Sequence, residues 1–85
     1  MNNHELSKSF ALSKDFKWMG GMKLLNGIRV LESYIPFMHP SDTPDVNDPA
    51  TFGCLLFLAR KKLDNQYWYP SKEPELVEIL AVLDQ

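Results

Sequence analysis

The sequence predicts an α+β fold in which a small antiparallel sheet packs on a central buried helix. Three observations lead to this prediction. A long apolar run follows a helix-capping aspartate, an Asn-Gly pair separates two apolar runs, and a short aromatic segment, QYWY, ends at a proline. They predict a helix over 49–63, a hairpin about Asn26-Gly27 and a strand over 66–69. A C-terminal helix over about 74–83 covers the rest of the sheet.

The N-terminal residues are mostly polar, so residues 1–9 are expected to be a flexible end and 10–85 a single domain. Two interpretations fit the residues that follow. The pattern after Phe10 has a period of two, typical of a short strand or extended arm near 8–12. Alternatively, Ser13 begins a helical turn with Asp15 in its first turn, and this interpretation is favoured.

The hairpin prediction depends on Asn26-Gly27, because a type I′ turn needs positive φ at both central residues. A two-residue loop places Lys23 opposite Val30, and neither face of the ribbon is then cleanly apolar. We therefore expect a bulge, or a strand buried on both faces near Val30-Leu31.

A proline-rich loop of about a dozen residues follows the hairpin. It contains Pro36, Pro40 and Pro44, which exclude most regular structure. Long ordered loops in small domains are often functional, so the stretch from Pro36 to Asp48 is a candidate binding loop.

The central helix has a clear start and end. Asp48 is a good N-cap, Pro49 suits the first helical position, and basic residues 60–62 suit the carbonyl end of the helix dipole. Its first two turns are apolar almost all round, which indicates burial. Gly53 costs about 1 kcal/mol of helix propensity against alanine. We expect a neighbouring backbone to approach closely there.

The C-terminal part combines the QYWY strand with a final helix. Pro70 closes the strand and indicates that it is short or lies at a sheet edge. Pro74 suits the first turn of the helix, and Leu76, Ile79 and Leu83 belong to its apolar stripe.

Composition narrows the class of protein. The chain has 85 residues, with 45% hydrophobic and 24% charged residues and a net charge of −2. This balance is typical of a globular domain and argues against general affinity for nucleic acid. A chain of this length buries only about 60–65% of its extended surface, so self-association would stabilise it.

The cysteine content and a search for targeting signals indicate the expected compartment. A single cysteine makes a reducing compartment the default, and neither a signal peptide nor a run of about 18 apolar residues is visible. A soluble, cytoplasmic protein is expected.

Three segments, FKWMGGM, GIRV and PDVNDPATFGCLL, together resemble a family of small uncharacterised proteins encoded in bacteriophages and prophages. The family pattern is F-x-W-x-x-G-M, then G-x-R-V, then D-P-A-T-x-G-C-L-L. The resemblance covers roughly residues 12–83, and the last motif is the most specific. The spacing between Val30 and Pro44 is shorter here than in many members. The resemblance implies a phage or prophage gene in a bacterial host, and it supplies no catalytic residue.

Cys54 is the only candidate nucleophile. It lies beyond the first helical turn, where the helix N-terminus activates a thiol little, so we interpret it as a buried small hydrophobe. His4 and His39 lack the paired spacing of metal ligands, so we expect no metal and no cofactor.

Asp42, Asp45 and Asp48 recur every three residues, whereas a calcium loop needs ligands at alternate positions and a glycine. Asp48 is better explained as the N-cap. Asp42 and Asp45 are expected to form turns or an acidic rim for a basic partner.

These observations predict a non-enzymatic protein-binding module in the bacterial cytoplasm, whose partner is a host or phage protein or a second copy of the chain. A strand over 66–69 would place Tyr67 and Tyr69 on one face and Trp68 on the other, and an exposed aromatic face suits a protein interface. The alternative hypothesis is a binder of nucleotides or single-stranded nucleic acid that uses Arg29, Trp18 and the Tyr67–Tyr69 strand. The candidate partner-binding residues are Arg29, His39, Asp42, Asp45, Tyr67, Trp68 and Tyr69.

Overall fold

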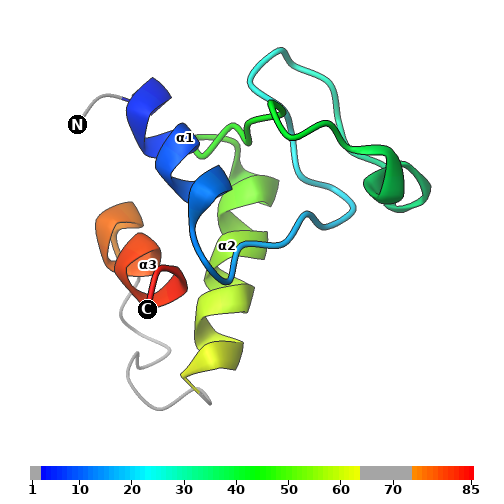
Figure 1. Ribbon diagram of the computed structural model, residues 1–85. Helices are drawn as coiled ribbons and strands as arrows, with labels where there is room; N and C mark the ends of the chain where they lie inside the picture. Colours follow the sequence, from blue (N-terminus) through cyan, green and yellow to red (C-terminus); the bar gives the residue numbers. More distant parts are fainter. Residues whose placement is uncertain (1–2, 64–73) are drawn as a thin grey trace.

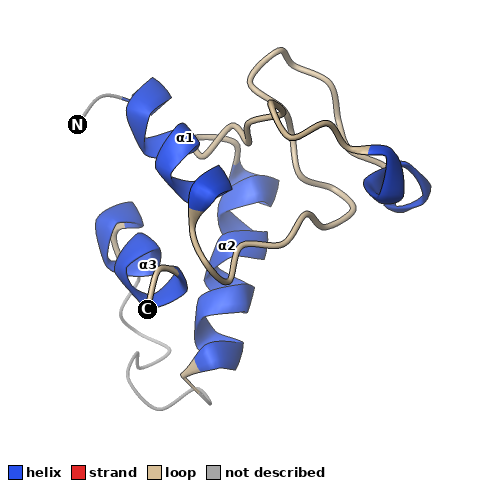
Figure 2. Cartoon of the chain, viewed as in Figure 1, coloured by secondary structure: helices blue, strands red, loops and turns tan. Residues whose placement is uncertain are grey.

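The computed structural model describes residues 3–63 and 74–85, and this part of the protein is helical (Figures 1 and 2). Its elements are α1 (Asn3–Leu12), the 3-10 helix η1 (Glu32–Phe37), α2 (Pro49–Lys62) and α3 (Leu76–Leu83). No strand or sheet occurs in these residues, so the predicted α+β fold is wrong. The predicted strand over 66–69 lies outside the described residues.

Helix α1 occupies most of the segment that the polar composition suggested would be flexible. Leu6 and Phe10 lie one turn apart and are both buried, and Ser7 between them is fully buried. The helix ends where Ser13 Oγ donates to the Phe10 carbonyl at 2.6 Å. Ser13 therefore closes a helix and does not begin one.

Helix α2 begins as its sequence predicts but is buried on one side only. Asp48 accepts a hydrogen bond from the backbone N–H of Thr51, and Pro49 occupies the first turn. Thr51, Leu55 and Ala59 recur every four residues and form the buried face. The helix is therefore present as predicted, but the prediction that it is buried all round is wrong.

Gly53 lies on the exposed side of α2. No atom outside the local backbone lies within 4 Å of the position that a Cβ would occupy there. The predicted close approach of a neighbouring backbone at Gly53 is therefore wrong.

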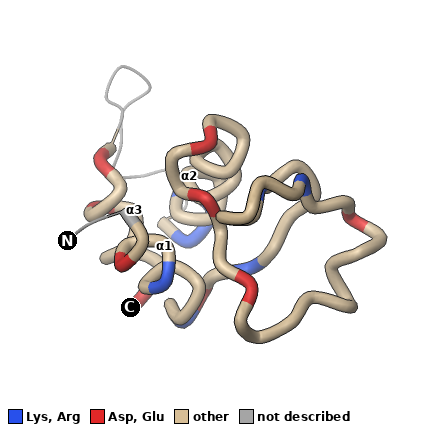
Figure 3. The backbone as a smooth tube through the Cα atoms, turned by 90° about the horizontal axis from the view of Figure 1, so that it is seen from above, with Lys and Arg blue, Asp and Glu red and all other residues tan. Residues whose placement is uncertain are grey.

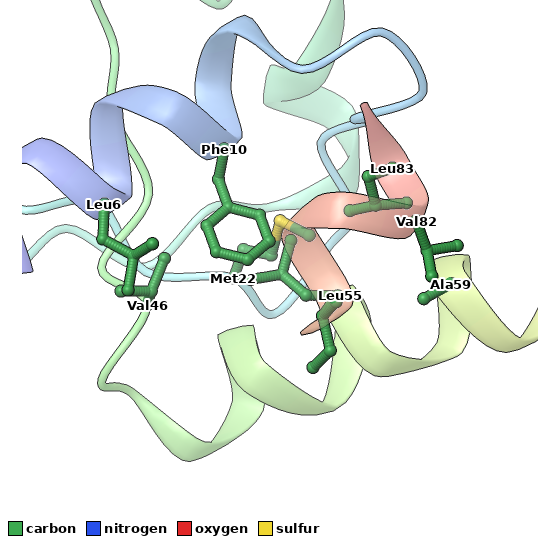
Figure 4. Packing of buried hydrophobic residues seen from close by; sticks show 9 residues of the cluster. Leu6, Phe10, Met22, Val46, Leu55, Ala59, Val82 and Leu83 are labelled. Carbon is green, nitrogen blue, oxygen red and sulfur yellow. The ribbon is translucent and has the colours of Figure 1, made fainter. Parts of the chain in front are cut away.

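The three α-helices share one core, which also includes Met22 and Val46 of the long connection between α1 and α2 (Figure 4). The Phe10 side chain points from α1 toward the region where Met22 and Leu55 lie, and Leu83 of α3 lies beside it. All four of these side chains are fully buried. Helix α3 packs against both α1 and α2.

Polar contacts tie the ends of the helices together. The Asp15 backbone N–H donates to the Leu83 carbonyl at 2.8 Å, just after α1. Lys62 at the end of α2 forms an ion pair with the Asp15 carboxylate and donates to the Gln85 carbonyl at 2.9 Å. Residues from the ends of all three helices thus meet at one side of the core.

The connection between α1 and α2 folds back on itself and projects away from the helices, with η1 at its far end (Figure 1). Lys23 lies opposite Arg29, and Leu24 opposite Pro44, as isolated antiparallel bridges. Residues 22–24 therefore lie between two other extended segments, 28–31 and 43–45. We call these three segments the ribbon.

The turn of the ribbon differs from the predicted two-residue loop. Leu25, Asn26 and Gly27 form it, with the Gly27 N–H donating to Leu24 O at 2.9 Å and Gly27 at a φ of 94°. This pattern is typical of a turn followed by a glycine bulge. The register moves by one residue, which places Met22 opposite Val30 and gives the ribbon one buried apolar face.

The ribbon does not extend into a sheet because its segments end early. The helix η1 begins at Glu32, directly after the second segment, and it includes Pro36. Pro44 lies within the third segment, where it cannot donate to a further strand. The Asn-Gly signal thus predicted a chain reversal, but the length of the paired segments depends on these neighbouring residues.

Candidate functional site

A cluster of exposed apolar residues lies on the ribbon and η1. It consists of Ile28, Leu31, Tyr34 and Phe37, and we call it the apolar edge. Leu31 is 66% exposed and Phe37 is 75% exposed. Single exposed apolar residues are ordinary on a protein surface, but a group on one projecting segment is typical of an interaction site.

A surface pocket of about 340 Å³ lies beside the apolar edge. Its lining combines apolar side chains with a few polar groups, a composition that suits a partner's side chain or a small ligand. The lining residues are Leu24, Asn26, Ile28, Arg29, Leu31, Tyr34 and Asp42. Two of the predicted partner-binding residues, Arg29 and Asp42, therefore meet at this pocket.

Arg29 also has a structural task. Its Nη1 donates to Asp48 Oδ2 at 2.6 Å and to the Gly21 carbonyl at 2.9 Å, and its Nη2 donates to Asp48 Oδ1 at 3.2 Å. This bidentate pair fixes the ribbon to the first turn of α2. The adjacent guanidinium, with the Thr51 hydrogen bonds, lowers the pKa of Asp48 to about 2. Arg29 is thus neutralised by an acidic partner.

His39 and Asp42 form a local turn at the start of the segment that leads from η1 back to α2. The His39 N–H donates to Asp42 Oδ2 at 2.8 Å, and His39 Nδ1 lies 2.6 Å from Ser41 Oγ. Asp45 accepts from the Asn47 N–H at 3.1 Å. All three side chains therefore organise the loop, and only Asp42 also lines the pocket.

Cys54 and the potential metal ligands are the remaining candidates for chemistry. Burial raises the pKa of the Cys54 thiol, and the charge of Asp48 adds to the effect, so the thiolate is disfavoured. Within residues 3–63 and 74–85, no group of three or more potential ligands could hold a metal ion.

The aromatic platform of the nucleic-acid hypothesis is only partly described. Trp18 packs against the core and meets Phe16 edge to face, with ring centroids 5.2 Å apart. Tyr67, Trp68 and Tyr69 lie outside the described residues, so their predicted role stays a prediction. Figure 3 shows basic and acidic positions interspersed along the described chain, and no continuous basic stripe is visible there.

A second exposed surface runs along the outer face of α2. It consists of Gly53, Leu56, Phe57, Arg60 and Lys61, which line a depression of about 520 Å³. Residues 49–59 contain no charged side chain, so most of this face is uncharged. It offers no open backbone hydrogen-bonding groups along its length, because helical N–H and C=O groups pair within the helix.

The residues of the apolar edge were not among the predicted site residues. Ile28 and Leu31 were placed in a hairpin, where apolar residues indicate core packing. The sequence does contain a signal for this surface, because residues 34–40 combine aromatic and apolar residues with prolines. A segment with such prolines cannot bury its apolar residues in a regular sheet.

No protein-family model matches the chain, and no match was found among curated proteins or solved structures. Within the described part of the chain, no helix has the length and apolar character needed to cross a membrane.

Proposed function

We propose that this protein is a non-enzymatic protein-binding module and that the apolar edge is its binding surface. The observation that carries the proposal is the exposure of Ile28, Leu31, Tyr34 and Phe37 on one projecting segment. Exposed apolar and aromatic side chains around a pocket supply the central contacts of protein interfaces. The resemblance to small phage and prophage proteins supports a host or phage protein as the partner and the bacterial cytoplasm as the compartment.

Local structure supports this assignment because the contacts that hold the ribbon in place do not use the side chains of the apolar edge. The hydrogen bond from the Lys23 N–H to Thr51 Oγ1 and the Arg29–Asp48 ion pair fix the ribbon to the start of α2. A binding surface on a fixed segment loses less conformational entropy on association than one on a mobile loop.

The test is an affinity capture from bacterial lysate with the full chain. A double variant, Leu31→Ser with Phe37→Ser, removes the exposed apolar groups. Val77→Ser on α3 is the matched control, because Val77 is also exposed but lies outside the apolar edge. Specific capture by the wild type and the control, but not by the double variant, would support the proposal. Equal capture by all three proteins, or capture by none, would contradict it.

A further inference from the structure

The hydrogen bonds of the ribbon show which backbone groups face outward. The Val30 N–H donates to Met22 O at 2.7 Å, and the Leu24 N–H donates to Ile28 O at 2.8 Å. These bonds flank the facing residues Lys23 and Arg29, which therefore form a non-hydrogen-bonded antiparallel pair. The N–H and C=O of Arg29 consequently point away from Lys23, toward the open side of the ribbon.

The open side is unpaired in the described part of the chain. The Arg29 N–H, the Arg29 C=O and the Leu31 N–H have no hydrogen-bond partner there. Leu31 has an extended backbone, with a φ of −92° and a ψ of 145°. Residues 28–31 thus present a short strand edge, the kind of surface that pairs with an added strand.

The apolar edge lies directly beside these open groups. Ile28 and Leu31 belong both to the strand edge and to the lining of the 340 Å³ pocket. A peptide strand paired with Arg29 would direct alternate side chains to one face. An apolar side chain of that strand fits the pocket composition.

The charges around the pocket favour a basic peptide. Asp48 neutralises Arg29, whereas Asp42 and Glu32 form no ion pair within the described residues. Asp42 lines the pocket, and Glu32 follows Leu31 directly. Lys23, opposite Arg29, likewise forms no ion pair in this part of the chain, so two unpaired acidic groups face one unpaired basic group and the net uncompensated charge around this edge is negative.

We infer that the edge formed by residues 28–31 binds an extended peptide segment of a partner protein in which lysine or arginine alternates with apolar residues. The peptide adds a strand to the ribbon through Arg29 and Leu31 and places an apolar side chain in the pocket. This inference rests on the proposed protein-binding function and specifies its partner chemistry and its mode of binding.

The probe is a short capped peptide in which lysine alternates with valine and leucine, titrated into the labelled full-length chain and followed by backbone amide NMR. The Arg29 and Leu31 amides should shift most. Replacement of the lysines by glutamates should weaken binding by about tenfold or more, because like charges would then meet. Unchanged Arg29 and Leu31 amides, or equal binding of both peptides, would overturn the inference.

Backbone methylation separates strand pairing from simple apolar contact. In an extended strand the N–H groups of alternate residues point to opposite edges. One peptide is methylated on the lysine nitrogens and another on the apolar-residue nitrogens. Strand pairing predicts that one of them loses binding and the other keeps it. Equal binding of the two would show that the backbone edge is not used.

Two variants of the protein complete the test. Leu31→Pro removes the N–H, and Leu31→Ala keeps it but removes most of the apolar side chain. Both should weaken peptide binding, with circular dichroism as the check on folding. If lysate capture depends on the apolar edge while neither the peptides nor Leu31→Pro has an effect, the proposed function stands and the strand-addition mode falls. If neither lysate capture nor peptide binding depends on the apolar edge, the proposed function and the strand-addition mode are both contradicted.

Discussion

The Arg29 guanidinium donates two hydrogen bonds to the Asp48 carboxylate, at 2.6 and 3.2 Å, and so links the ribbon to the N-cap of α2. The same carboxylate accepts from the N–H and the hydroxyl of Thr51. The Thr51 hydroxyl oxygen in turn accepts from the Lys23 N–H at 2.8 Å. The G-x-R-V and D-P-A-T segments, separate in sequence, thus form one polar network that positions the apolar edge.

This network predicts loss of stability in acid. The pKa of Asp48 is lowered to about 2 in the folded protein, below its ordinary value of 3.8. A lowered folded pKa contributes stability that is complete above the unfolded pKa and is lost as the pH falls through the folded value. The Asp48 contribution should therefore decline between about pH 4 and pH 2.

Denaturant unfolding at several pH values measures this decline. Arg29→Met removes the guanidinium that lowers the Asp48 pKa, so the variant should show a shallower loss of stability across that window. The Lys62–Asp15 pair, which lowers the pKa of Asp15, is retained in both proteins and keeps its own acid dependence. Parallel pH profiles for wild type and variant would show that the Arg29–Asp48 pair does not couple to folding.

Thr51 allows the neutral part of the network to be tested. Its side chain is fully buried, and its hydroxyl is the acceptor for the Lys23 N–H. Thr51→Val keeps the shape but leaves this partly buried N–H unpaired, which should lower the free energy of unfolding by about 1–3 kcal/mol.

Chemical denaturation of Thr51→Val and Thr51→Ser provides the comparison. Serine keeps the hydroxyl and should retain more stability than valine, although it loses a methyl group. The network hypothesis fails if valine proves as stable as wild type and serine does not.

The helices could be predicted only as far as local residues determine them. Asp48 and Pro49 mark the start of α2 because a cap and an N-terminal proline act within one turn. The first helix escaped prediction because its buried side consists mainly of Leu6 and Phe10, one per turn. A stripe this narrow gives a weak periodic signal among polar residues.

The sheet was predicted wrongly because strand pairing depends on distant residues. Asn26-Gly27 marks the chain reversal, but η1 and Pro44 limit the paired segments to isolated bridges. Arg29 was predicted as a partner-binding residue, which stays a prediction; its ion-pair partner Asp48 is 19 residues away, and no local pattern identifies that pair. The strand edge at residues 28–31 follows from the observed register, which the sequence does not specify.

Substitution by alanine should have opposite effects on the stability of the protein at Gly53 and at Gly27. Gly53 lies in an exposed position of α2 with open space around it, so Gly53→Ala should stabilise the protein by about 0.5–1 kcal/mol. Gly27 has a φ of 94°, and Gly27→Ala should destabilise it by about 1–2 kcal/mol through backbone strain.

Thermal and denaturant unfolding of the two variants measures this difference. A clear loss of stability in Gly53→Ala at high protein concentration, absent on dilution, would instead indicate that a second copy packs on the outer face of α2. Equal effects of both substitutions would contradict the assignment of Gly27 to a left-handed turn position.

Leu55 provides a test of the helical core. It is fully buried between the three helices, whereas Leu12 at the end of α1 is 74% exposed. Leu55→Ala removes buried apolar contacts and leaves a cavity, which should lower the free energy of unfolding by about 2–5 kcal/mol. Leu12→Ala should change it by no more than about 0.5 kcal/mol. Denaturant midpoints of the two variants, measured in parallel, make the comparison independent of absolute extrapolation. Similar midpoints would mean that Leu55 does not lie in a packed core, and the helical arrangement that supports the apolar edge would have to be revised.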